Sequence, residues 1–99
     1  MPEQPLQIFE KLDPQLLKLV ESAGELALAD GALPRKFKLL IAMALDAAHG
    51  ATGGVKSLTQ AAMQAGATKE EVVEALRVAY YISGVGSVYT AAPAFKELF

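Results

Sequence analysis

The chain has 99 residues, of which 53% are hydrophobic and 20% are charged, and its formal net charge is −2. This length suits a single domain, residues 1–99, and so small a domain buries only about two-thirds of its unfolded surface. A mean hydropathy of +0.29 is high for a small monomer, so we expect part of the apolar surface to lie between the subunits of a homo-oligomer. The weak negative charge excludes a general attraction to nucleic acid. The one basic cluster, Arg35, Lys36 and Lys38, is interpreted as a solvated helix face.

The sequence contains no cysteine, which excludes disulfides, thiolate metal sites and thiol nucleophiles. No apolar run reaches the roughly 18 residues that a membrane-spanning helix needs. The first seven residues include Pro2, Glu3 and Pro5 where a signal peptide has basic and then apolar residues. We therefore expect a cytoplasmic protein that does not bind a membrane.

The spacing of apolar residues predicts an all-α fold. They recur three and four residues apart almost throughout, and alternating runs of Val, Ile and Thr do not occur. We expect six helices, at residues 5–12, 14–30, 34–49, 52–65, 69–82 and 87–98. The third is apolar on nearly every side, so it should be central or lie at a subunit interface. Pro93 should kink or restart the last helix.

Local signals indicate where several helices begin and end. Asp13 before Pro14 is a strong start signal, because Asp caps free N–H groups and Pro fits the first helical position. Gly31 is expected to end that helix. Thr68 with Glu71 three residues later forms a capping box, which predicts the start of the fifth helix.

Two stretches of the sequence carry a family resemblance. Residues 40–50 read Leu-Ile-Ala-Met-Ala-Leu-Asp-Ala-Ala-His-Gly, and residues 61–76 end an Ala-rich helix with Gly-Ala-Thr before restarting with Glu-Glu. The first resembles the central helix of carboxymuconolactone decarboxylase and alkylhydroperoxidase D-like (AhpD-like) proteins, and the second resembles their following helix, turn and capping box. The resemblance spans about residues 34–82. It implies an AhpD-like bundle of about six helices, assembled into a homo-oligomer, either a trimer or a hexamer.

The resemblance also says which residues would carry the family's redox chemistry. Redox-active members have a glutamate on the central helix, a Cys-x-x-Cys at the next helix N-terminus, and a histidine four residues further on. A helix N-terminus stabilises a thiolate, and the glutamate and histidine move its protons. The matching positions here hold Leu39 for the glutamate, Ala51 and Gly54 for the cysteines, and Leu58 for the histidine. Thiol peroxidase and disulfide reductase activities are therefore excluded. The decarboxylase branch keeps a histidine where Leu58 stands, which argues against lactone decarboxylation too.

One histidine remains as a candidate base. His49 lies three residues after Asp46 on the same helical face, where the carboxylate could orient the imidazole. Such a pair can act as a general base. The simpler alternative is a histidine favoured by the dipole at a helix C-terminus, beside a solvated aspartate. Two ligands are too few for a metal site, so we expect no metal and no cofactor.

A second candidate site lies where the fourth helix begins. Thr52, Gly53, Gly54 and Lys56 offer free backbone N–H groups and an ammonium that could receive a small carboxylate or a phosphate. The alternative is an ordinary glycine-containing loop.

Tyr80 is the last candidate for ligand binding. It is adjacent to Tyr81, so one of the two should point inward, into core packing or into a cavity lined by Tyr89 and Met43.

Two functional hypotheses follow from these residues. The first is a non-redox binding or structural module, an oligomer whose family site has been closed by apolar residues. The second is a cofactor-free lyase or isomerase that acts on a small carboxylic acid or lactone, with His49 and Asp46 as the base.

Overall fold

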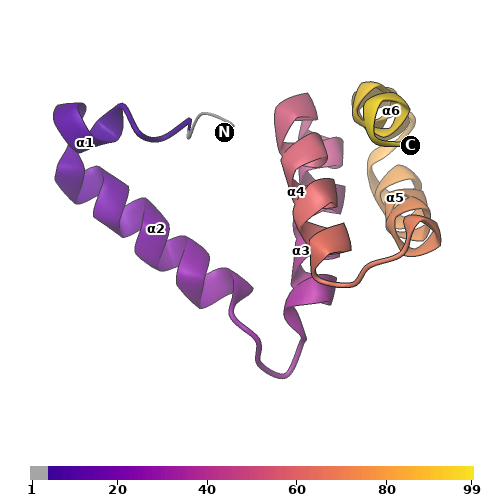
Figure 1. Cartoon of the computed structure of the whole chain (residues 1–99). Coiled ribbons are helices and arrows are strands. Elements are labelled where there is room, and N and C mark those ends of the chain that lie inside the picture. Colours follow the sequence, from indigo (N-terminus) through magenta and orange to yellow (C-terminus); the bar gives the residue numbers. More distant parts are fainter. Residues whose placement is uncertain (1–4) are drawn as a thin grey trace.

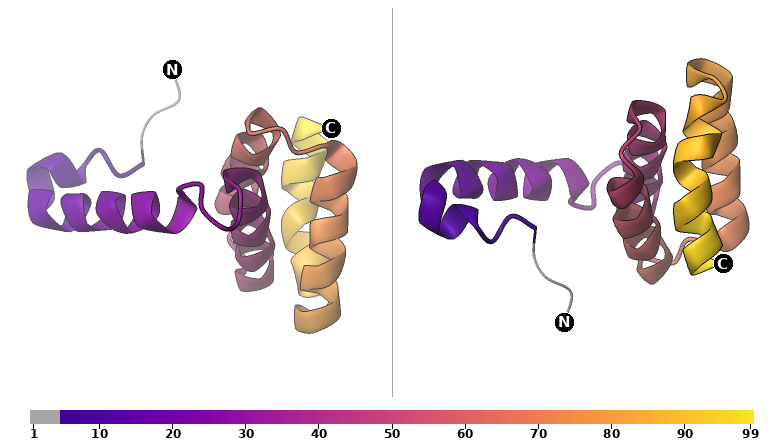
Figure 2. Two further views of the ribbon diagram at one scale, coloured as in Figure 1. Left: turned by 90° about the horizontal axis from the view of Figure 1, so that it is seen from below. Right: turned by 90° about the horizontal axis from the view of Figure 1, so that it is seen from above.

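The computed structural model describes residues 5–99, which form six α-helices and no strand (Figure 1). The helices are α1 (Phe9–Leu12), α2 (Pro14–Leu28), α3 (Arg35–His49), α4 (Thr52–Gln64), α5 (Lys69–Ser83) and α6 (Gly86–Leu98). This confirms the predicted all-α fold. Helices α3 and α4 form one layer of a four-helix bundle, and α5 and α6 form the other (Figures 1 and 2). Helices α1 and α2 project from the bundle as an arm (Figure 2).

Two of the predicted helix starts rest on side-chain caps that the structure confirms. The Asp13 carboxylate accepts the backbone N–H of Leu16 at 3.0 Å, with Pro14 in the first turn of α2. At the start of α5, Thr68 Oγ1 accepts the N–H of Glu71, and the Glu71 carboxylate accepts the N–H of Thr68. Each pair satisfies N–H groups that have no acceptor inside their helix.

Two predicted helix boundaries differ from the structure by a few residues, and the last helix does not restart at Pro93. The first helix is the four-residue α1, not residues 5–12. Helix α2 ends at Leu28, before Gly31, because the backbone of Ala29 is extended. The next residue, Asp30, belongs to the connection to α3, where its carboxylate accepts the N–H of Arg35 at 2.6 Å. Helix α6 runs through Pro93 as one element without restarting. Pro93 is exposed, and its nitrogen cannot donate the hydrogen bond that a helix would direct to the carbonyl of Tyr89.

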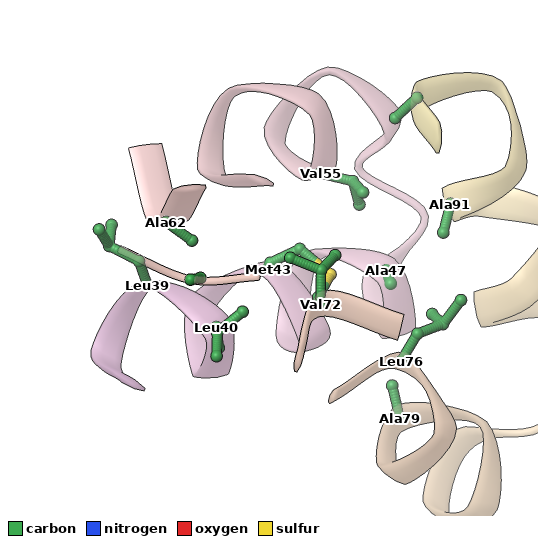
Figure 3. Close-up of a cluster of buried hydrophobic side chains, with 12 residues drawn as sticks. Leu39, Leu40, Met43, Ala47, Val55, Ala62, Val72, Leu76, Ala79 and Ala91 are labelled. Carbon is green, nitrogen blue, oxygen red and sulfur yellow. The ribbon is translucent and has the colours of Figure 1, made fainter. Parts of the chain in front are cut away.

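The core lies between the two layers and consists largely of small residues (Figure 3). Half of its buried hydrophobic residues are alanines, and the complete set is Leu39, Leu40, Met43, Ala47, Val55, Ala62, Ala67, Val72, Leu76, Ala79, Ala91 and Ala94. Helix α3 contacts α2, α4, α5 and α6, which confirms its predicted central place. Alanines let helices approach closely, but each buries little apolar area, and the stabilisation is about 25 cal/mol per Å² buried. The bundle therefore gains only modest hydrophobic stabilisation from its own core.

The chain exposes more surface than a compact monomer of its size. Its accessible area is 7026 Å², whereas a folded monomer of 10.4 kDa exposes roughly 5,400 Å². Its radius of gyration is 14.1 Å, compared with about 12.6 Å for a compact domain of this length. The arm accounts for this shape, because no residue of α1 or α2 is buried. Within residues 5–99, no helix has both the length and the apolar character needed to cross a bilayer.

Hydrogen bonds between α3 and the end of α2 hold the arm in its projecting orientation. Lys38 Nζ donates to the carbonyl of Ala29 at 2.7 Å, and Arg35 Nη1 donates to the carbonyl of Leu28 at 3.4 Å. Cations are favourable at this position because the last carbonyls of a helix carry partial negative charge. Lys36, the third residue of the predicted basic cluster, instead pairs with Glu71 on α5 at 3.1 Å. All three cations thus make contacts within the chain.

Candidate functional site

The sharp connection between α3 and α4 brings the predicted polar residues together. Gly50 ends α3 in the left-handed conformation, with a φ of 80° that glycine adopts most easily. The N–H of Ala51 donates to the carbonyl of Asp46 at 2.9 Å, and the N–H of Gly50 donates to the carbonyl of Ala47 at 3.4 Å. This is the Schellman pattern of helix termination. It reverses the chain so that the last turn of α3 faces the first turn of α4.

The Asp46 carboxylate lies against Gly54 in this first turn of α4. A Cβ atom at Gly54 would collide with Asp46 Oδ2 and would come within 2.8 Å of Asp46 Cγ. Glycine is therefore what permits this close approach. The N-cap residue Ala51 has no side chain that can cap α4, and within residues 5–99 no side chain caps it by a hydrogen bond. A carboxylate at this end of α4 interacts favourably with the positive end of the helix dipole.

The predicted anion site at the start of α4 already has charged groups from the chain itself around it. Asp46 lies where a bound carboxylate would approach Gly54. Lys56 Nζ does not face that position as a free cation, because it pairs with Glu97 of α6 at 2.8 Å. Thr52 and Gly53 are exposed. The four predicted residues therefore lie together at the start of α4, where Asp46 adds a negative charge and Lys56 is already paired with Glu97.

His49 and Asp46 do not form the hydrogen-bonded pair that a general base would need. His49 is the last residue of α3 and is exposed, whereas Asp46 is half-buried and turned toward Gly54. Within residues 5–99 no hydrogen bond or ion pair joins the two side chains. The ring also lines neither the apolar groove between α3 and α5 nor the smaller hollow beside Lys69 and Arg77. Its surroundings match a helix C-terminal histidine.

The four positions that the resemblance matches to a redox site lie in the apolar interior or at the helix junction. Leu39 is only 1% exposed, and Leu58 packs against the same core. Ala51 is the half-buried N-cap of α4, three residues before Gly54, the site of the Asp46 contact. Next to Leu58, Thr59 is fully buried, and its Oγ1 has no hydrogen-bond partner within the described residues. Among residues 5–99, Thr59 and Ser87 are the buried polar side chains, and the Ser87 hydroxyl has a partner in the carbonyl of Gly84.

The predicted inward position of a tyrosine on α5 was wrong. Tyr80 is 51% exposed and Tyr81 is 83% exposed. The inward positions of α5 are Val72, Leu76 and Ala79, which follow the helical repeat. The two tyrosines fall outside this row, and Met43 is sealed in the core. The structure therefore brings no tyrosine of α5 together with Met43 in a cavity.

An apolar groove between α3 and α5, of about 530 Å³, was not predicted as a site. We call it the α3/α5 groove, and its lining is Leu33, Phe37, Leu40, Ile41, Ala44, Leu45, Ala48, Ala75, Val78, Ala79, Ile82 and Ser83. It contains no charged residue and none of the predicted site residues. The sequence did contain a signal for this groove, since the third helix is apolar on nearly every side. The core covers only part of that helix, and the remaining apolar residues line the groove.

Comparison with known proteins agrees with this architecture. The family description "Carboxymuconolactone decarboxylase family" matches residues 14–97. Among solved structures, the chain is similar to the apo crystal structure of a carboxymuconolactone decarboxylase family protein from Legionella pneumophila. The two share 38% sequence identity with a TM-score of 0.86, over 92% of this chain and 81% of that one. A search of curated proteins gave no match.

Proposed function

The chain belongs to the carboxymuconolactone decarboxylase family, and on that premise we propose that it is a non-redox member, a cytoplasmic self-associating module that binds or scaffolds. The observation that carries this proposal is the loss of every reactive group from the family's site. Leu39, Ala51, Gly54 and Leu58 stand at the positions of the proton carriers and thiols. The chain contains no cysteine that could replace them. Without a thiolate, neither peroxide reduction nor disulfide exchange has a nucleophile.

Self-association is supported by the surface that the single chain leaves uncovered. The chain exposes roughly 1,600 Å² more than a compact monomer of the same mass. Much of this surface is apolar, on both the arm and the α3/α5 groove. Contiguous apolar patches of this kind mark protein contacts. We propose a homo-oligomer, with a trimer or a hexamer as the expected size.

Sedimentation equilibrium tests the self-association directly. We expect a mass that is a multiple of 10.4 kDa at micromolar concentration. A protein that sediments only at 10.4 kDa would contradict the proposal. The measurement should be repeated over a range of dilutions, because mass action shifts the equilibrium toward the monomer once the concentration approaches the dissociation constant.

The competing hypothesis is a lyase or isomerase with His49 and Asp46 as base, and it has less support. Asp46 faces Gly54, Lys56 is paired with Glu97, and His49 is exposed. A thermal-shift screen of small carboxylates and lactones compares wild type with His49→Ala. Substitution of an exposed side chain leaves the fold intact. A ligand at a hundred times its Kd would stabilise the protein by about 2.7 kcal/mol, or roughly 10 °C or more in a domain of this size. A shift of that size that disappears in His49→Ala would favour the enzyme.

A further inference from the structure

Helix α2 presents an uncovered apolar face to solvent. Its members recur at helical spacing and are all exposed, and they are Leu16, Leu19, Val20, Ala23, Leu26 and Ala27. Leu19 is 68% exposed and Leu26 is 84% exposed. We call this set the α2 stripe. The opposite face of the helix carries Lys18, Glu21 and Glu25. An amphipathic helix of this kind normally buries its apolar face against a partner surface.

The α3/α5 groove has the shape that accepts a helix. Its floor consists of residues that are buried or half-buried and mostly alanine: Leu40, Ala44, Ala48, Ala75 and Ala79. Its walls are large and exposed: Phe37, Ile41, Leu45, Val78 and Ile82. Small residues in a floor allow the ridge of another helix to approach, and large walls enclose it on both sides. No charge would be buried by such docking.

The stripe and the groove have matching lengths. The stripe runs from Leu16 to Ala27, which is about 16 Å at the α-helical rise of 1.5 Å per residue. The α3 side of the groove runs from Phe37 to Ala48, again about 16 Å.

We infer that the α2 stripe of one copy docks in the α3/α5 groove of a second copy, an inference that rests on the proposed self-association. The uncovered area supports this arrangement. A standard protein interface buries about 800 Å² on each partner, and the excess surface of this chain is roughly twice that value. Each copy has two faces to cover, its own stripe and its own groove. Covering the stripe and the groove of each copy would bury an area equal to the excess accessible surface.

The connection between α2 and α3 favours a second copy over the chain's own arm. Helix α2 points away from the bundle in every view (Figures 1 and 2). Its end is held by hydrogen bonds from Lys38 to Ala29 and from Arg35 to Leu28, and by the bond from the N–H of Arg35 to Asp30. Folding back into its own groove would break these bonds. Docking in another copy preserves them.

Charge substitutions test the docking. Leu19→Glu on the stripe and Ile41→Glu on the groove wall both replace side chains that are exposed in the single chain, so the bundle itself tolerates them. Each should raise the dissociation constant at least about a hundredfold, because docking would bury an unpaired carboxylate. Lys18→Glu on the polar face of α2 is the matched control and should keep the wild-type mass. If Leu19→Glu and Ile41→Glu keep the wild-type mass, the docking is overturned while self-association stands. If the wild-type protein is monomeric, both the docking and the proposed self-association are wrong.

Cross-linking identifies the occupant of the groove. Because the chain has no native cysteine, a thiol-specific reagent reacts only at the introduced positions. Ala23→Cys protein is mixed with Ile41→Cys protein and treated with a short thiol-specific cross-linker. The expected product is a covalent heterodimer, confirmed by mass spectrometry of the linked peptides. Glu25→Cys on the opposite face of α2, paired with Ile41→Cys, should give much less. Docking in the chain's own groove would give no heterodimer, and pairing between two arms would give Ala23→Cys homodimers alone. Either result overturns the inference.

Discussion

The carboxylate of Asp46 on α3 lies against the backbone of Gly54 on α4, at a point where even one methyl group would collide with it. The contact links the last turn of one helix to the first turn of the next. It places negative charge at a helix start whose N-cap, Ala51, has no polar side chain. Asp46 thus stabilises α4 from outside that helix.

Substitution of Gly54 should reveal this contact as a coupling between two residues. Gly54→Ala gains up to about 1 kcal/mol of helix propensity but forces the Asp46 side chain to rotate away. In wild type we therefore expect no gain or a loss of stability. In an Asp46→Ala background the same change should stabilise, which gives a coupling of about 1 kcal/mol in urea unfolding. Gly53→Ala is the control, because a Cβ there meets no atom within 4 Å. It should stabilise equally in both backgrounds, and equal effects at Gly54 would refute the contact.

Acid should weaken the protein through Glu71. Its carboxylate accepts the N–H of Thr68 at 2.9 Å and pairs with Lys36 at 3.1 Å, and these contacts hold its pKa below the ordinary value of 4.5. A carboxylate with a lowered folded-state pKa stabilises the fold above its unfolded pKa. That contribution falls away as pH drops below about 4.5 and through the lowered value. Urea midpoints from pH 7 to pH 3, at constant protein concentration, should therefore fall more steeply for wild type than for Glu71→Gln.

The neighbouring Glu70 supplies the control for this pH dependence. It makes no hydrogen bond or ion pair within residues 5–99. Glu70→Gln should keep the steep wild-type decline. Identical pH profiles for Glu71→Gln and wild type would show that the Thr68 and Lys36 contacts do not form in solution.

Thr59→Val should stabilise the protein by about 1 kcal/mol. The two side chains have the same shape, and the substitution removes a buried Oγ1 that has no partner among the described residues. Thr90→Val is the comparison, because Thr90 Oγ1 donates to the carbonyl of Gly86 at 2.9 Å. We expect that change to be neutral or destabilising by up to about 1 kcal/mol. Denaturant midpoints decide between these outcomes, and a destabilised Thr59→Val would indicate an internal water or other partner.

Lys38→Ala should loosen the base of the arm. It removes the hydrogen bond to the Ala29 carbonyl, which contributes about 0.5–1.5 kcal/mol. Amides in the last turn of α2 should then exchange with solvent roughly 2- to 10-fold faster. Lys36→Ala removes a cation of the same helix that contacts α5 instead, so it should leave α2 exchange unchanged. Equal exchange in wild type and Lys38→Ala would contradict the role given to this hydrogen bond.

The sequence predicted features that depend on neighbouring residues and missed those that depend on distant ones. Asp13 with Pro14, and Thr68 with Glu71, determine helix starts by local hydrogen bonds, so they were found. The ion pair between Lys56 and Glu97 joins two helices far apart in the chain. This ion pair occupies the ammonium that the sequence had offered to a bound anion. The contact of Asp46 with Gly54 depends on the direction that α4 takes after the turn at Gly50, and the sequence does not show that direction.

The arm was invisible to sequence reasoning for a different reason. The apolar periodicity of α2 is the same whether the helix packs on its own bundle or on another chain. Only the connection at Ala29 and Asp30 shows that it projects.

Under the proposed self-association, that projection would link the lifetime of the protein to its abundance. A helix of 15 residues is marginal in water when nothing packs against it, and α2 buries no residue within its own chain. A freshly made or diluted copy therefore offers a fraying segment to proteases while its four-helix bundle stays folded. Under the proposed self-association, degradation would remove copies that find no neighbour, so the amount of protein synthesised would determine how long each copy survives.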